Sequence, residues 1–273
     1  MTPLSFHRAP LFKLFFVLTV GTLINLPATI SFAETSEDKG KRIAYEADEY
    51  DKGFINYRAS QKMVLRNRKG QESIRVLKIS VLENEESGDK SLIVFNRPRD
   101  VRGTAMLTHS HKIKDDDQWL YLPALKRVKR ISSSNKSGSF MGSEFSYEDM
   151  TSQEIEKYSY LWLRDEPCGN LLCWVTERRP KSKNSGYSRQ ISWIGQKEYR
   201  VWKTEYYDRK NTLLKTLIVD DYNQYQNKHW RATNMFMTNH LTGKSTELIW
   251  EDYEFNIELD NASFTKVSLK RAR

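Results

Sequence analysis

After residue 55 the chain repeats one kind of unit, in which a short run with apolar residues at alternate positions is followed by a turn. Examples are the runs at 73–82, 171–177 and 212–222, and the turns NRKG, NEESGDK, DRKN and LTGK. Strands of this composition, separated by turns about every 8–12 residues, are typical of antiparallel all-β folds. Long consecutive strands favour a strongly curved sheet or an up-and-down barrel over a parallel fold.

One helix is predicted ahead of the strands. Thr35 and Asp38 fit a capping box, and apolar residues then recur at helical spacing through Tyr50. Gly53 stands where such a helix would end.

Residues 1–33 have the pattern of an export signal. Arg8 and Lys13 precede the uncharged run LFFVLTVGTLINL, and the chain then reaches SFA before Glu34. An uncleaved membrane anchor is the alternative, but the run is shorter than the roughly 20 residues that a spanning helix needs. We expect cleavage after Ala33, a periplasmic mature protein, and a single monomeric domain over residues 34–273. No Cys follows the cut, so we expect no lipid anchor.

The charge of the mature chain points to anionic partners. Removing Arg8 and Lys13 from the formal net charge of +9 leaves 9 − 2 = +7. In an exported protein the matching partners are anionic lipid headgroups, acidic glycans or an acidic protein face, and we expect no nucleic acid. The alternative is that the basic residues form only a solvated surface.

Cys168 and Cys173 are the only two cysteines, five positions apart. In an oxidising compartment so close a pair predicts a disulfide across a hairpin tip. A redox C-x-x-C motif has two intervening residues, whereas this pair has four. The disulfide is therefore expected to be a local staple.

Several strands carry apolar and aromatic residues on one face, such as Thr246, Leu248 and Trp250. One face must be the interior of the curved sheet. Such a face either packs as a core or holds an apolar ligand.

The segment from Trp119 to Met150 is the most unusual part of the chain. Apolar residues flank a basic cluster and a Ser-rich stretch, SSSNKSGSFMGS. The small polar residues predict a mobile stretch. One hypothesis is that Phe140 and Met141 cover an apolar cavity as a flap. Replacing both by Ser should then weaken lipid binding. The alternative is an ordered loop whose Phe140 and Met141 complete the core. Glu148 and Asp149 are expected to pair with the basic cluster or to cap a helix.

Two sets of site residues follow from this segment. The predicted ligand-binding residues are Trp119, Tyr121, Leu122, Leu125, Phe140, Met141, Phe145 and Tyr147. The predicted partner- or headgroup-binding residues are Lys126, Arg127, Lys129 and Arg130, which could equally be a solvated strand rim.

The motifs WLYLPALKRVKRI, SGSFMGSEFSYED, PRDVRGTAML and DNASFT resemble the LolA-like outer-membrane lipoprotein-sorting family. This resemblance covers most of the mature chain. It implies an incomplete antiparallel barrel of about 11 strands, as in LolA and LolB, with a few helices forming a lid or plug. It also implies a cavity for acyl chains, and a partner that is a resistance-nodulation-division transporter or an outer-membrane acceptor.

Catalytic and metal chemistry find little support. His109 and His111 lie two residues apart beside three aspartates, but no third ligand is fixed by spacing. Ser133 and Lys136 match S-x-x-K, but within a Ser-rich loop such a match arises easily by chance. The nucleophile elbow G-x-S-x-G is missing from the sequence. We expect that the protein is not an enzyme and that it binds no metal and no cofactor. The predicted function is a periplasmic carrier for a lipid or the acyl chains of a lipoprotein, with an envelope lipid sensor or adaptor as the alternative.

Overall fold

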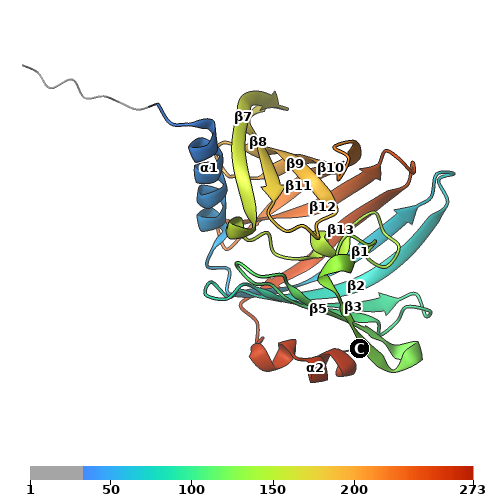
Figure 1. Cartoon of the computed structure of the whole chain (residues 1–273). Coiled ribbons are helices and arrows are strands. Elements are labelled where there is room, and N and C mark those ends of the chain that lie inside the picture. Colours follow the sequence, from blue (N-terminus) through green and yellow to red (C-terminus); the bar gives the residue numbers. More distant parts are fainter. Residues whose placement is uncertain (1–32, 273) are drawn as a thin grey trace, which may run out of the picture. The chain divides into compact units, whose positions relative to one another are not determined.

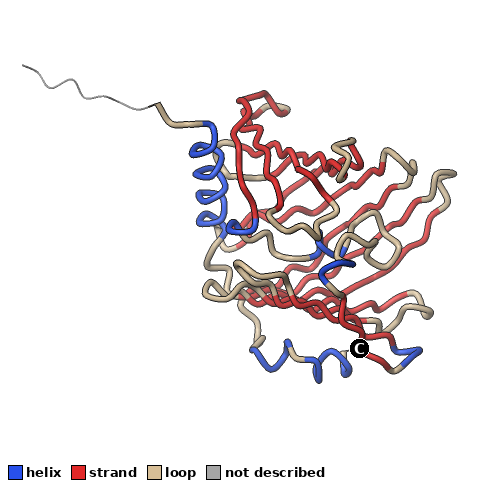
Figure 2. Tube along the Cα trace, viewed as in Figure 1, coloured by secondary structure: helices blue, strands red, loops and turns tan. Residues whose placement is uncertain are grey.

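The computed structural model describes residues 33–272, and those from Glu34 onward belong to one compact unit. The predicted signal segment lies almost entirely outside the described residues. Thirteen strands form a single sheet (Figures 1 and 2). They are β1 (Asn56–Arg66), β2 (Glu72–Leu82), β3 (Lys90–Arg97), β4 (Ala105–His109), β5 (Asp117–Leu122), β6 (Arg127–Ile131), β7 (Tyr158–Cys168), β8 (Leu171–Pro180), β9 (Tyr187–Gly195), β10 (Val201–Asp208), β11 (Leu213–Tyr225), β12 (His229–Asn239) and β13 (Ser245–Phe255).

The sheet is antiparallel and open. Its strand order is β6-β5-β4-β3-β2-β1-β13-β12-β11-β10-β9-β8-β7, so β1 pairs with β13 and the edge strands are β6 and β7. The predicted incomplete antiparallel barrel is confirmed. The number of strands is 13 rather than about 11, and β4 and β6 contribute only five residues each.

Residues 132–157, here called the plug segment, connect the two edge strands and run inside the curve of the sheet (Figure 1). The segment contains three short 3-10 helices, η2 (Ser133–Asn135), η3 (Tyr147–Met150) and η4 (Ile155–Lys157). Its side chains contact strands from both halves of the sheet. Gln118 of β5 bonds to the Tyr147 carbonyl, and Tyr187 of β9 bonds to Asp149. The sheet therefore curls around this segment, and the face that it touches is called the concave face.

Helix α1 (Ser36–Asp51) begins as predicted, because the Thr35 hydroxyl accepts from the Asp38 amide at 3.1 Å. It packs against β7 through Gly40, which is buried. A Cβ atom at Gly40 would lie 2.6 Å from the backbone nitrogen of Trp162. Only glycine permits this close approach of helix and strand.

The C-terminal residues cover the opposite face of the sheet. The short helix η5 (Asn261–Phe264) leads into α2 (Lys266–Arg271), which lies on the outer side of β4 and β5 (Figure 1). Phe264 and Leu269 are buried there against Val94, Ala105 and Leu107. Strands β3 to β5 are thus buried on both faces.

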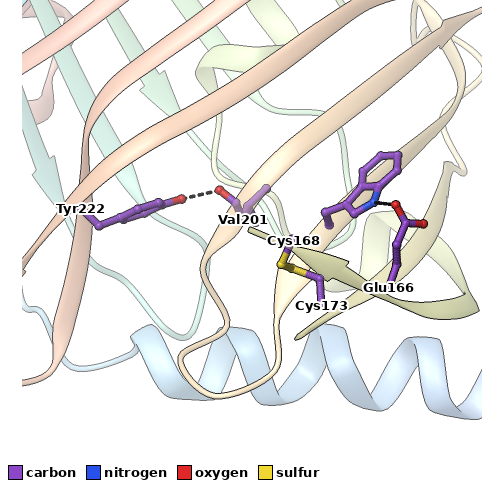
Figure 3. Close-up of a disulfide and its surroundings, with 6 residues drawn as sticks. Glu166, Cys168, Cys173, Val201 and Tyr222 are labelled. Carbon is purple, nitrogen blue, oxygen red and sulfur yellow. Dashed lines mark hydrogen bonds between the residues drawn. A yellow bond between two sulfur atoms is a disulfide. The ribbon is translucent and has the colours of Figure 1, made fainter. Parts of the chain in front are cut away.

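The predicted disulfide is present at the tip of the β7–β8 hairpin (Figure 3). Cys173 is fully buried and packs with Val175, Ile191 and Trp193. Near it, Glu166 accepts from the Trp193 indole at 3.0 Å, and Tyr222 bonds to the Val201 carbonyl (Figure 3). The staple holds the far corner of the sheet, away from the plug segment.

No helix among residues 33–272 is long and apolar enough to cross a membrane.

Candidate functional site

The concave face carries the largest apolar cluster of the described chain. Strands from both halves contribute to it, and Phe140 and Phe145 of the plug segment complete it. The buried members are Met63, Leu77, Ile79, Ile93, Phe95, Met106, Leu120, Ile131, Phe140, Phe145, Tyr187, Tyr206, Met237 and Leu248. The cluster is the packed core between the sheet and the plug segment.

Phe140 sits at the centre of this cluster and is fully buried. Its ring lies 5.8 Å from the ring of Phe95 and 5.8 Å from that of Tyr147. Met141 is half-buried against the same cluster, and Arg75 donates to its carbonyl oxygen. In this structure the plug segment therefore fills the concave face, as the core-completing alternative requires; whether it moves as a flap stays a prediction.

A buried ion pair anchors the plug segment. The Lys215 ammonium on β11 lies 2.7 Å from Asp149, and it also donates to the Glu144 carbonyl at 2.9 Å. The Tyr187 hydroxyl donates to Asp149 at 2.9 Å. Burial raises the pKa of Tyr187, and the neighbouring Asp149 carboxylate raises it further. Asp149 thus accepts from one cation, from the Tyr187 hydroxyl, and from the amide and hydroxyl of Ser146.

Asp149 also closes a capping box with Ser146 at the start of η3. The expected pairing of Glu148 and Asp149 with the basic cluster is corrected, because Asp149 bonds to Lys215 and Glu148 accepts from the Ser185 hydroxyl and the Gly186 amide. Burial raises the pKa of Glu148 despite these bonds. The capping alternative holds for Asp149.

Three of the predicted ligand-binding residues, Trp119, Tyr121 and Leu125, do not lie on the concave face. Trp119 and Tyr121 face the outer side, where Trp119 packs with Phe264 and Leu269. Leu120 and Leu122 face the plug segment instead. Leu125 is exposed, at 68% of its surface. In the sequence WLYL both the odd and the even positions are apolar, because this strand is covered on both faces. Alternation therefore could not tell which of the two faces points inward.

The remaining predicted ligand residues lie at the concave face. Phe145 is buried, and Leu122, Met141 and Tyr147 are partly buried against the cluster. Burial raises the pKa of the Tyr147 phenol. These four residues and Phe140 form one group on the concave face. Trp119 and Tyr121 of β5 do not belong to it.

The four basic residues are exposed but do not form one patch. Lys126 occupies a turn with a left-handed backbone, φ 47°, and the other three lie on the edge strand β6. Arg127 and Lys129 pair with Leu122 and Leu120, which places them on the concave side, whereas Arg130 pairs with Trp119 on the outer side. Arg130 also forms an ion pair with Asp117.

The two histidines are engaged separately. His109 donates to the Phe264 carbonyl at 2.8 Å, and burial lowers its pKa. His111 bonds to Asp117 at 3.0 Å. Within residues 33–272, no group of three or more His, Cys, Asp or Glu side chains is placed to hold a metal ion.

A pocket of about 580 Å³ opens beside the plug segment, between the two edges of the sheet. Ile131 of β6 and Tyr158 of β7 both line it, together with Lys136 of the plug segment. Lys136 donates to the Ser182 hydroxyl at 2.9 Å and pairs with Asp115 at 3.3 Å. The pocket therefore lies where the two edge strands of the open sheet face each other.

Fold and site together define an open antiparallel half-barrel whose apolar concave face is filled by a segment of its own chain. A family model described as an uncharacterized protein matches residues 87–271. A search of curated proteins gives no match.

Solved structures give closer comparisons. A structure from Vibrio parahaemolyticus, described as an outer membrane lipoprotein-sorting protein domain, is 52% identical with a TM-score of 0.85, over 86% of this chain and 100% of that one. A DUF1329 family protein from Desulfovibrio piger is 32% identical with a TM-score of 0.82, over 86% and 99%. A LolA superfamily protein from Nitrosomonas europaea shares the fold at 20% identity, TM-score 0.68, over 86% and 100%. The chain therefore belongs to the LolA-like outer-membrane lipoprotein-sorting family.

Proposed function

We propose that the mature chain, residues 34–273, is a monomeric periplasmic carrier that binds the apolar part of a lipid or lipoprotein on its concave face. The observation that supports this most directly is the apolar cluster covered by Phe140 of the plug segment. Family membership supports the same proposal, since a 52% identical relative is described as a lipoprotein-sorting domain. The bound chain is sequestered, and no bond is made or broken.

The plug segment and an acyl chain would compete for the same surface. Burial of apolar area drives both arrangements, at about 25 cal/mol per Å². A ligand shifts the equilibrium only by its differential affinity for the two states. Binding therefore requires the plug segment to leave the cluster, and its return would help to release the cargo to an acceptor.

The partner is proposed from the family and from charge. A resistance-nodulation-division transporter or an outer-membrane acceptor would approach the edge strand β6, where Arg127 and Lys129 are exposed beside the opening. Their charge fits an anionic membrane or an acidic protein face.

The test is native mass spectrometry of the mature protein purified from the periplasm without detergent, followed by analysis of released lipid. A defined adduct of lipid mass supports the carrier. A clean apo mass that persists after incubation with envelope lipids would contradict it and favour the adaptor alternative.

Replacing Phe140 and Met141 by Ser gives a second test, for which we propose the opposite effect on lipid affinity to the one expected from the sequence. Because Phe140 is buried in the lipid-free protein, the variant destabilises the closed form and should raise lipid affinity rather than weaken it. Leu241→Ser, at an exposed turn residue, is the matched control and should change nothing. Weaker binding of the double variant would mean that both side chains contact the cargo.

A further inference from the structure

Two side chains on the concave face have buried polar atoms without a hydrogen-bond partner among the described residues and lie opposite each other on neighbouring strands. They are Gln61 of β1, whose amide nitrogen and oxygen are both unpaired, and Trp250 of β13, whose indole N–H is unpaired. Gln61 is 1% exposed. Buried polar groups in folded proteins are almost always paired, so two unpaired groups at one place call for an explanation.

The two side chains are neighbours on the same face. Gln61 lies opposite Trp250 on one side and opposite Leu77 on the other in the strand register. Residues opposite each other in an antiparallel pair project to the same face. Leu77 belongs to the concave cluster, Trp250 packs against it, and Met63 follows Gln61 on the same face two residues later. Gln61 and Trp250 therefore form one polar spot within an apolar wall.

A charged residue, Arg75, lies near this spot. It lies opposite Met63, two positions along the strand from Gln61, and its guanidinium donates to the Met141 carbonyl while the plug segment is in place. Gln61 and Trp250 themselves are neutral. They therefore match a neutral polar group better than a charged one, because neither side chain supplies a counter-charge.

We infer that Gln61 and Trp250 bind the carbonyl group that joins an acyl chain to its headgroup, once the plug segment has left the concave face. An acyl chain is apolar along its length, and its first polar atom is the ester or amide carbonyl oxygen. The Gln61 Nε2 and Trp250 Nε1 groups are donors that match this acceptor, and the Gln61 Oε1 atom can accept from the N–H of an amide-linked chain. This inference rests on the proposed carrier function and deepens it, because it sets how far the cargo inserts.

The test compares three probes in native mass spectrometry of the mature protein. They are a phosphatidylethanolamine with ester-linked chains, its ether-linked analogue, which lacks both carbonyls, and N-palmitoylglycine, which carries an amide. The wild type should bind the ester lipid about fivefold to tenfold more tightly than the ether lipid, as one or two neutral hydrogen bonds would give. A stronger preference for the amide probe would point to lipoprotein cargo, and a stronger preference for the ester lipid to phospholipid.

Gln61→Leu and Trp250→Phe should each bring the ratio of the ester-lipid affinity to the ether-lipid affinity toward one. The affinity for the ether lipid should stay unchanged. Equal binding of both lipids by the wild type, or an unchanged preference in both variants, would overturn the inference and leave the carrier function intact. If the wild type bound no probe at all, the proposed function would itself fail.

The lipid-free protein gives an independent readout. Gln61→Leu should raise the melting temperature, because an apolar side chain replaces an unpaired amide. The matched control is Gln118→Leu, since Gln118 is also buried but donates to the Tyr147 carbonyl at 2.9 Å, and its loss should lower the melting temperature. A lower melting temperature for Gln61→Leu would show that the amide is paired within the fold, against the inference.

Discussion

The ammonium nitrogen of Lys215 lies 2.7 Å from a carboxylate oxygen of Asp149, and the two side chains are only 4% and 7% exposed. One residue belongs to strand β11 and the other to the plug segment, 66 positions away in the chain. This pair joins the cover of the concave face to its wall.

Replacing Lys215 by Met should lower the free energy of unfolding by about 3–5 kcal/mol, because it leaves the Asp149 carboxylate buried without its cation. Chemical denaturation measures this, and hydrogen exchange should show loss of protection in residues 132–157. The double variant Lys215→Met with Asp149→Leu should recover part of the stability. A double variant as unstable as the sum of the two single changes would argue against direct coupling.

Gly40→Ala should destabilise the protein by about 1–3 kcal/mol, although alanine is the better helix former. The added Cβ would lie 2.6–2.8 Å from the backbone of Leu161 and Trp162, and backbone cannot rotate away. Lys41→Ala, at the exposed neighbouring position, should change stability by less than about 0.5 kcal/mol. A stabilised Gly40→Ala variant would show that α1 does not pack closely on β7.

Stability should fall as pH rises toward and through 7 because of Glu154. Burial raises the pKa of Glu154 from 4.5 to about 7, and the Asp89 carboxylate adds to the shift, followed by those of Asp116 and Asp48, while Lys157 opposes it. A carboxyl group whose pKa is raised by folding binds its proton more tightly in the folded state. Its contribution is therefore fully present below about pH 4.5 and is lost as pH rises through about 7.

Melting temperatures of wild type and Glu154→Gln between pH 4 and 8.5 measure this effect. The variant should show a flatter profile and be more stable than the wild type at pH 8. Glu86→Gln, at an exposed position, should keep the wild-type slope. Parallel profiles for wild type and Glu154→Gln would remove Glu154 as the cause.

Replacing both Cys168 and Cys173 by Ala should cost about 2 kcal/mol, as expected for the small loop that a separation of five residues closes. Reduction of the wild-type disulfide should give a similar shift in the denaturation midpoint. Complete unfolding of the variant at room temperature would show that the staple supports more than its own hairpin.

Replacing Lys126, Arg127, Lys129 and Arg130 by Gln should reduce co-sedimentation with vesicles containing anionic lipid by at least about tenfold, at roughly 1 kcal/mol per basic residue near the surface. Lipid binding in the concave face should be unaffected. The triple change of Lys69, Lys210 and Lys244 to Gln, all exposed turn residues, tests whether net charge alone matters. If that control lost binding equally, no specific membrane-facing edge would be needed.

Local patterns predicted much of this fold because they depend on neighbouring residues. The Thr35 cap, the disulfide at a hairpin tip and the succession of antiparallel strands each follow from spacing of a few residues. The candidate site was only partly predictable. Lys215 interrupts an apolar strand face and so gives a signal of buried charge, but nothing local names Asp149 as its partner.

Alternation, turn chemistry and capping depend on contiguous residues, so the sequence by itself determined the antiparallel strands and the first helix. The open half-barrel and the family followed from the resemblance of four motifs. The tertiary structure decided which face of each strand is concave. In WLYL both faces are apolar, and only the packing of α2 on one of them shows that the other is concave. It also decided that Phe140 fills the concave face, and that Gln61 meets Trp250 across the pairing of the first and last strands. These relationships join residues far apart in the chain, and only closure of the sheet around the plug segment brings them together.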